Sequence, residues 1–205
     1  KNQNELLINN IKIISDKASL TSNGKIIFNN SSPYLDINID FDESDVEYIS
    51  SFIPDKTNSA LSEWINNSIL GGKIQSGNIA FKGFTENSSL KNSKKNFNAI
   101  LNLSDVNLDY NQEWPPIDEI EANLTVNNGD LSANITSGKI YDANISNAYV
   151  VIKELAENDY HVIVDTKIQA HTNDIKNFIA MSPLSNNRTL QKHTNKIIGN
   201  TDISL

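Results

Sequence analysis

Alternation between apolar and polar residues is the dominant pattern of this chain. From Leu35 to Phe41 every second residue is apolar, and the residues between are Asp or Asn. Successive side chains of a strand point to opposite faces, so this pattern predicts a half-buried strand. The same alternation recurs over Phe97–Leu103, Ile120–Val126, Leu131–Ile135 and Tyr160–Ala170. These segments predict a meander of antiparallel strands with one apolar face throughout.

Short polar segments separate the predicted strands. Asn127–Asp130 contains Asn-Gly, which tolerates positive φ and predicts a hairpin turn. Glu157–Asp159 predicts a second turn, and Gly138 and Asp142–Asn144 mark the ends of shorter strands. The spacing favours consecutive strands joined by tight connections.

Two segments depart from the alternation and have helical spacing. Between Thr57 and Leu70 the apolar residues recur three or four apart around Trp64, and Gly71 is a natural residue to follow a helix. We therefore expect a helical crossover over residues 56–71.

The second helical segment is expected over residues 173–195. Ile175, Phe178 and Ile179 lie on one side of a helix that ends near Ser182–Pro183, because proline cannot continue it. The polar stretch that follows favours another short helix, and Ile203 lies in a further expected strand.

Composition narrows the possible functions. The 205 residues carry a net charge of -8, which argues against nucleic acid because binding to phosphates needs a basic face. There are no cysteines, and no apolar run approaches the roughly 20 residues of a membrane-spanning helix. The chain begins at Lys1 in what reads as a strand, so we expect residues 1–205 to be a single fragment of a longer protein.

The sequence contains no motif typical of a catalytic or metal site. His161, His171 and His193 are far apart in sequence, and the acidic residues around Asp36–Glu47 do not fit a calcium loop, which would need glycine at Glu43. No Gly-x-Ser-x-Gly elbow or phosphate-binding glycine loop is present. We expect no enzyme activity, no metal and no cofactor.

The order of several landmarks resembles the YhdP family of AsmA-like envelope proteins, which are bridge-like lipid transport proteins. The landmarks are Phe52-Ile-Pro54, the pair Trp64-Ile65, the strand Gly77–Phe84, the segment Tyr110–Pro115, Ser182-Pro-Leu184 and Gly199. The resemblance covers roughly Leu35 to Leu205.

The resemblance implies both a fold and a cellular location. The implied fold is mainly β, a long twisted antiparallel sheet curled into a groove (β-taco-like), with two short helical segments. The implied location is the periplasmic part of an inner-membrane-anchored bacterial envelope protein. The implied role is to carry phospholipids between the inner and outer membranes.

Elementary physics, taken separately, leaves three ways to cover the apolar face, of which lipid binding is one. A sheet with one apolar face must cover that face by folding over itself, by binding a partner or by holding lipid chains. Acyl chains would gain about 0.8 kcal/mol per buried CH₂. The lining candidates are Leu35, Ile37, Ile39, Phe41, Leu101, Leu103, Ile120, Leu124, Val126, Val162, Val164 and Ile168. The expected partners are phospholipid acyl chains and the rest of the same polypeptide.

Two other interpretations remain open from the sequence. A structural or protein-interaction β-domain with a closed core and no ligand would show the same alternation. A carbohydrate-binding β-sandwich would use Trp114, Tyr110 or Tyr141 as a stacking platform. Exposed edge strands also predict possible self-association.

Overall fold

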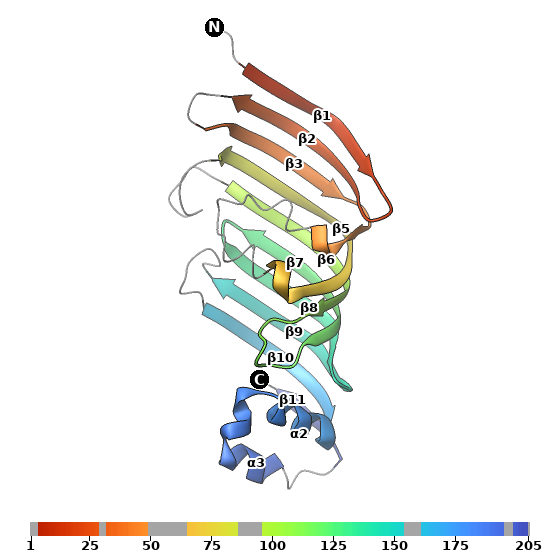
Figure 1. The fold of residues 1–205 in the computed structure, drawn as a ribbon, viewed down its shortest axis with the longest axis vertical. Helices are drawn as coiled ribbons and strands as arrows, with labels where there is room; N and C mark the ends of the chain where they lie inside the picture. Colours follow the sequence, from red (N-terminus) through yellow and green to blue (C-terminus); the bar gives the residue numbers. More distant parts are fainter. Residues whose placement is uncertain are drawn as a thin grey trace.

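One antiparallel sheet dominates the structure. The computed structural model describes residues 4–28, 32–48, 65–85, 96–153, 161–194 and 199–204. The strands of this described part are β1 (Asn4–Ile14), β2 (Ser19–Phe28), β3 (Tyr34–Phe41), β4 (Ser44–Asp45), β5 (Ile69–Phe84), β6 (Asn96–Leu108), β7 (Ile117–Asn127), β8 (Asp130–Ile140), β9 (Ala143–Lys153), β10 (His161–His171) and β11 (Asn200–Ser204). They stack in sequence order along the long axis of the molecule, and the short β4 also pairs with β5 (Figure 1).

The sheet is open. In the strand order of the described residues, β1 and β11 stand at the two ends and each has one neighbour, so the sheet is not closed into a barrel. The mainly β, antiparallel fold predicted from the alternation is therefore confirmed. A β-sandwich, as the carbohydrate-binding interpretation required, is wrong because the described strands form a single sheet.

The predicted strands agree closely with the observed ones. Four of the alternating segments lie inside β3, β6, β7 and β8, and the last is β10, which begins at His161; Tyr160 lies outside the described residues. The hairpin predicted at Asn127–Asp130 is confirmed. Asn128 and Gly129 form its turn with φ of 50° and 100°, the left-handed conformation that joins two antiparallel strands tightly.

The predicted crossover helix ends too late. Within the described residues the chain is helical over 65–68, and β5 begins at Ile69. Residues 69–71 were expected to be helical, but Ile69 pairs with Leu108 and Gly71 with Asn107 of β6. Pairing with β6 overrides the local helical spacing there. The remainder of the prediction, including Trp64, lies outside the described residues.

The C-terminal part contains three short helical pieces where residues 173–195 were expected to be helical. They are α2 (Thr172–Ala180), the 3₁₀ turn η2 (Pro183–Asn186) and α3 (Arg188–Thr194). His171 is the N-cap of α2: its Nδ1 accepts a hydrogen bond from the Asn173 N–H at 3.3 Å, and its own N–H donates to Asp174 Oδ2 at 3.2 Å. This capping box fixes where strand β10 turns into helix.

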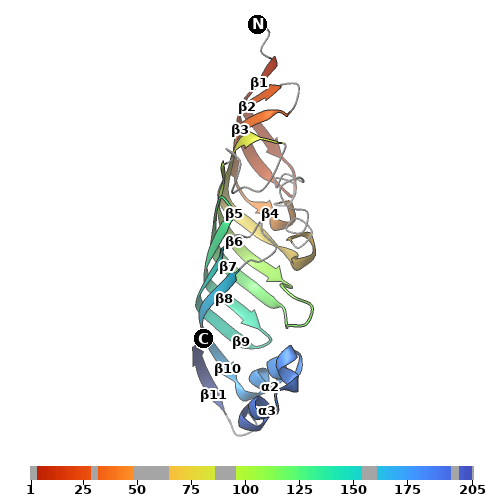
Figure 2. The ribbon, with the colours of Figure 1, turned by 90° about the vertical axis from the view of Figure 1, so that its left-hand side faces the viewer.

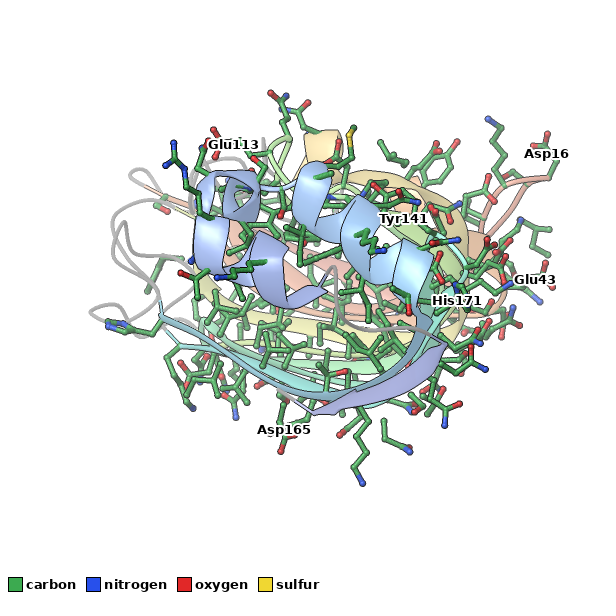
Figure 3. The ribbon with its side chains drawn as sticks, turned by 90° about the horizontal axis from the view of Figure 1, so that it is seen from below. Asp16, Glu43, Glu113, Tyr141, Asp165 and His171 are labelled. Carbon is green, nitrogen blue, oxygen red and sulfur yellow. The ribbon has the colours of Figure 1, made fainter. Side chains whose placement is uncertain are left out.

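β-Bulges bend the sheet. Residues with positive φ stand at register shifts within the sheet, namely Asn10, Asp105, Glu119 and Asn147. Side chains of the neighbouring strands accept hydrogen bonds from three of these backbone N–H groups. Asn10 donates to Asn23 Oδ1, Asp105 to Glu121 Oε1 and Glu119 to Asn107 Oδ1. Bulges increase local twist and bending. The sheet accordingly curves, as seen along its long axis in Figure 3.

The covering elements all lie on one side of the sheet. Figure 2 shows β4, α2 and α3 on the same side, while the other side carries no helix among the described residues. None of the described helices is long and apolar enough to cross a membrane. The concave side of the sheet is therefore the covered one.

Candidate functional site

All the lining candidates lie on the concave face of the sheet. Paired residues of antiparallel strands share a face, so the register can be followed from strand to strand. One continuous row, called the first row, runs through Ile13, Leu20, Phe41, Gly77, Leu101, Leu124, Ala133, Val150 and Val164. The structure thus brings together candidates from β3, β6, β7 and β10 that are far apart in sequence.

A second row lies next to the first. It runs through Ile11, Ser22, Ile39, Ile79, Ala99, Val126, Leu131, Ile152 and Val162. The remaining candidates pair with other apolar residues on this face: Leu35 with Ile26, Ile37 with Phe81, Leu103 with Ile74, Ile120 with Val106 and Ile168 with Ile145. Apart from Ser22, every residue in this second row is apolar, so the face is predominantly apolar from β1 to β10.

The convex face is polar and hydrogen-bonded. Asn78 Nδ2 on β5 donates to Asn38 Oδ1 at 2.9 Å and to Asp40 Oδ1 at 2.7 Å on β3. Asn102 Nδ2 donates to Ser76 Oγ at 2.8 Å. Figure 3 shows Asp165 of β10 pointing away from the helices on this outer side. The convex face is therefore mostly polar, as the alternation predicted, although it also exposes Ile100 and Ile163.

Exposure divides the concave face into a middle and two ends. In the first row Leu101 is 1% exposed, whereas Ile13 on β1 is 51% exposed and Val164 on β10 is 49% exposed. The second row repeats this: Ile79 is buried, and Ile11 and Val162 are each about half exposed. The candidate residues are therefore not equivalent: Phe41, Leu101 and Ile120 are core, whereas Val162 and Val164 of β10 face open space.

The middle is a tightly packed hydrophobic core. Phe41, Val46, Ile74 and Leu101 belong to one buried cluster, and Val46 comes from the segment just after β4. Gly77 lets the strands approach: a Cβ there would lie 2.5 Å from Leu101 Cδ2 and 2.7 Å from the Ile100 carbonyl oxygen. Leu101 thus occupies the space that a side chain at position 77 would need.

A second cluster closes the face beside β8 to β10. Ile140, Ile145 and Ala148 form it, and Phe178 of α2 packs against it. The Trp114 ring, in the connection between β6 and β7, contacts Phe178 with 5.7 Å between ring centroids. Trp114, which the carbohydrate-binding interpretation would use as a stacking platform, instead packs against helix α2.

Two ion pairs involve lysines that stand next to buried residues in their strands, Lys73 beside Ile74 and Lys139 beside Ile140. Lys73 Nζ and Asp45 Oδ1 are 2.6 Å apart, and the hydrogen bond with Asp45 is the main cause of the raised pKa of Lys73. The pKa of Lys139 is raised by its pairing with Glu119, also at 2.6 Å. The side chains of Lys73 and Lys139 are 41% and 42% exposed, so water screens the pairs and they contribute little to stability.

Titratable groups at the edges have varied surroundings. Burial, together with the negative charge of Asp109, raises the pKa of Tyr110. His161 and His171 are exposed, and His171 serves as a helix cap. Within the described ranges, no group of three or more His, Asp or Glu side chains is placed to hold a metal ion.

Sequence reasoning missed the contribution of β1. Leu6 and Ile8 lie on the concave face, and so do Ile11 and Ile13, because the bulge around Asn10 changes which alternate residues face inward. An uninterrupted period of two does not describe such a strand. The adjacent polar residues Asn9 and Asn10 between Ile8 and Ile11 are the local signal of the bulge.

Comparison with known proteins gives one finding. The family model described as YhdP protein matches residues 1–205, which extends the resemblance to the residues before Leu35. Neither a curated protein nor a solved structure matches the chain.

Proposed function

Because this chain belongs to the YhdP family of bacterial envelope proteins, we propose that it is a segment of a periplasmic lipid conduit. Its concave apolar face shields phospholipid acyl chains on their way between the inner and outer membranes. The protein is not an enzyme in this proposal, and its partners are acyl chains and the rest of the same polypeptide.

The observation that carries the proposal is the half-exposed apolar ends of the two rows. Ile11 and Ile13 at one end, and Val162 and Val164 at the other, continue a hydrophobic core without being covered by it. Aliphatic side chains in this arrangement gain free energy from any apolar group that removes them from water. An acyl chain fits because it is long, flexible and free of polar atoms.

The proposal is tested by extracting the purified protein with organic solvent and identifying phospholipid by mass spectrometry. Stoichiometric phospholipid in the wild-type protein, and less in a Val164→Asp variant purified in parallel, is the expected result. Absence of lipid from a folded wild-type protein, together with failure to bind added phospholipid, would contradict the proposal.

One observation favours a second candidate, a structural or protein-interaction domain with a closed core. Ile74 is fully buried and Leu101 almost so, which means that the side chains of the protein itself fill the middle of the face. The same extraction separates the two candidates, because a closed domain would purify without lipid. Its apolar ends would then bind another protein instead.

A further inference from the structure

The apolar surface that a ligand can reach on the concave face lies in two separate places. Among the described residues of the two rows, the apolar side chains that are about half exposed all come from β1 and β10. They are Ile11 and Ile13 on β1, called the β1 end, and Val162 and Val164 on β10, called the β10 end. Both ends are open to solvent, so a molecule from outside can reach them directly.

Strand β5 forms a barrier between the β1 end and the β10 end. Its apolar side chains on the concave face, Ile74, Ile79 and Phe81, are buried. They are spread along the strand, so the barrier crosses the width of the sheet. Val46 belongs to the same buried cluster as Ile74 and Ile79. A ligand that starts at one end therefore meets packed side chains of the protein before it reaches the other.

Hydrogen bonds anchor the segment that carries Val46 over β5. Ser44 Oγ accepts the Ser19 N–H at 3.0 Å, and the Asp45 N–H donates to the Lys17 carbonyl oxygen at 2.7 Å. Ser44 is almost completely buried. The pairing of Asp45 with Lys73 joins the segment to β5 as well. The cover over the middle is thus fixed to the start of β2 on one side and to β5 on the other.

The two ends are too far apart for a single acyl chain to touch both. β10 is the eighth strand beyond β1 along the sheet, and at about 4.8 Å per strand the two are roughly 38 Å apart along it. Figure 1 shows β1 and β10 toward opposite ends of the long axis. The hydrocarbon core of a bilayer is about 30 Å thick and contains two layers of acyl chains, so one chain spans about 15 Å. Each end therefore needs a chain of its own.

The exposed apolar area at each end suits an acyl chain better than a protein partner. Complete burial of an aliphatic side chain removes about 60–120 Å² of apolar surface from water. A pair of half-exposed side chains therefore offers on the order of 100 Å² at each end. A stable protein interface buries about 800 Å² on each partner. An acyl chain lying along a few residues of one strand matches the smaller area.

We propose that this segment holds two phospholipids at independent sites, one with its acyl chain against the β1 end and one with its acyl chain against the β10 end. This inference rests on the proposed function and gives the number and the position of the sites within it. Lipids would pass along the segment by transfer between separate sites, because the packed side chains of β5 interrupt the apolar surface between them.

Native mass spectrometry of the protein mixed with soluble dioctanoyl phosphatidylcholine tests the inference by counting bound lipids. The wild type should bind up to two, Ile13→Asp and Val164→Asp one each, and the double variant none. The remaining site in each single variant should keep its dissociation constant within about twofold, as expected for distant sites. Leu7→Asp and Ile163→Asp are the matched controls: both residues lie on the convex face of the same strands and are 60% exposed, so these variants should bind two.

Several results would overturn the inference while the conduit proposal stands. One is a wild type that holds a single lipid which either substitution releases, because that would indicate one continuous site. Others are two lipids retained by Val164→Asp, or a protein dimer in which a second copy occupies one end. Binding of no lipid by the folded wild type would overturn both proposals. If a variant does not fold, the number of lipids on the wild type still decides.

Discussion

The middle and the ends of the concave face have the same sequence pattern and different environments. Leu101 and Val164 belong to the same row of paired residues, yet Leu101 is almost completely buried and Val164 is half exposed. Their strands, β6 and β10, both alternate apolar and polar residues. The difference arises because segments distant in sequence cover the middle, such as the one that carries Val46.

This comparison shows why one apolar face can serve two purposes. A packed middle stabilises the sheet, since buried aliphatic groups in close contact contribute the largest share of folding free energy. Open ends keep apolar surface available for something else. A charged substitution in the middle of the face should therefore unfold the protein. A charged substitution at one of the ends should remove lipid binding there and leave the protein folded.

The largest expected effect is that of Leu101→Asp. Placing a carboxylate in the buried cluster should cost at least about 4 kcal/mol of unfolding free energy, because both packing and solvation of the charge are lost. Urea unfolding measures it. The control is Ile100→Asp, one residue away on the convex face and 59% exposed, which should stay folded. If Leu101→Asp were as stable as the wild type, the middle would not be core.

A smaller cost is expected for Gly77→Ala. The added methyl group would meet Leu101 Cδ2 and the Ile100 carbonyl oxygen, and overpacking of this kind costs about 1–3 kcal/mol. Gly71→Ala is the matched control, because a Cβ at position 71 has nothing within 4 Å. There the substitution should be neutral or stabilising by up to about 1 kcal/mol. Equal unfolding midpoints for the two variants would argue against close packing at Gly77.

Val164→Asp should change stability least among the apolar-face variants and should still reduce lipid association. Val164 is half exposed, so its charged replacement keeps contact with water, but an acyl chain would have to lie against a carboxylate. Co-purified phospholipid and the unfolding midpoint are measured together. Ile163→Asp, on the convex face and 60% exposed, is the control that should retain lipid. Loss of lipid from both variants would show that lipid association does not depend on which face carries the charge.

The smallest effect concerns alkaline pH. Burial first, and then the charge of Asp109, raises the folded-state pKa of Tyr110 above 10.0. Tyr110 therefore makes its full contribution to the free energy of unfolding below about pH 10. That contribution is lost as the pH rises through the higher folded-state pKa. The pKa of Lys82 is raised too, by Asp36, and this pair weakens in the same range. Tyr110→Phe should make the alkaline loss of stability less steep without abolishing it, and a slope equal to that of the wild type would contradict this assignment.

Period-two alternation was sufficient to predict which residues lie on each face of the sheet. It did not predict which segments cover the apolar face. The apolar sides of β3, β6, β7 and β10 follow directly from the sequence, because the direction of a strand side chain is a local property. Burial of Leu101 depends on which distant segments fold over it, and no local pattern encodes that.

The errors also have a physical origin. Residues 69–71 looked helical by spacing, but their pairing with β6 is a non-local interaction that local periodicity cannot detect. The inward residues of β1 were missed because the bulge at Asn10 resets the alternation. Pairing between strands therefore determines the secondary structure and the face of each residue wherever the local sequence pattern is short or interrupted.

The most direct test of the account is photocrosslinking from the two faces. A benzoylphenylalanine residue would be placed at Ile13 or Val164 on the open concave ends, and at Ile100 or Ile163 on the convex face, in protein mixed with phospholipid. The account predicts acyl adducts by mass spectrometry from Ile13 and Val164 and almost none from the convex positions. Equal adduct yields from the two faces would contradict the claim that the open ends of the concave face hold acyl chains.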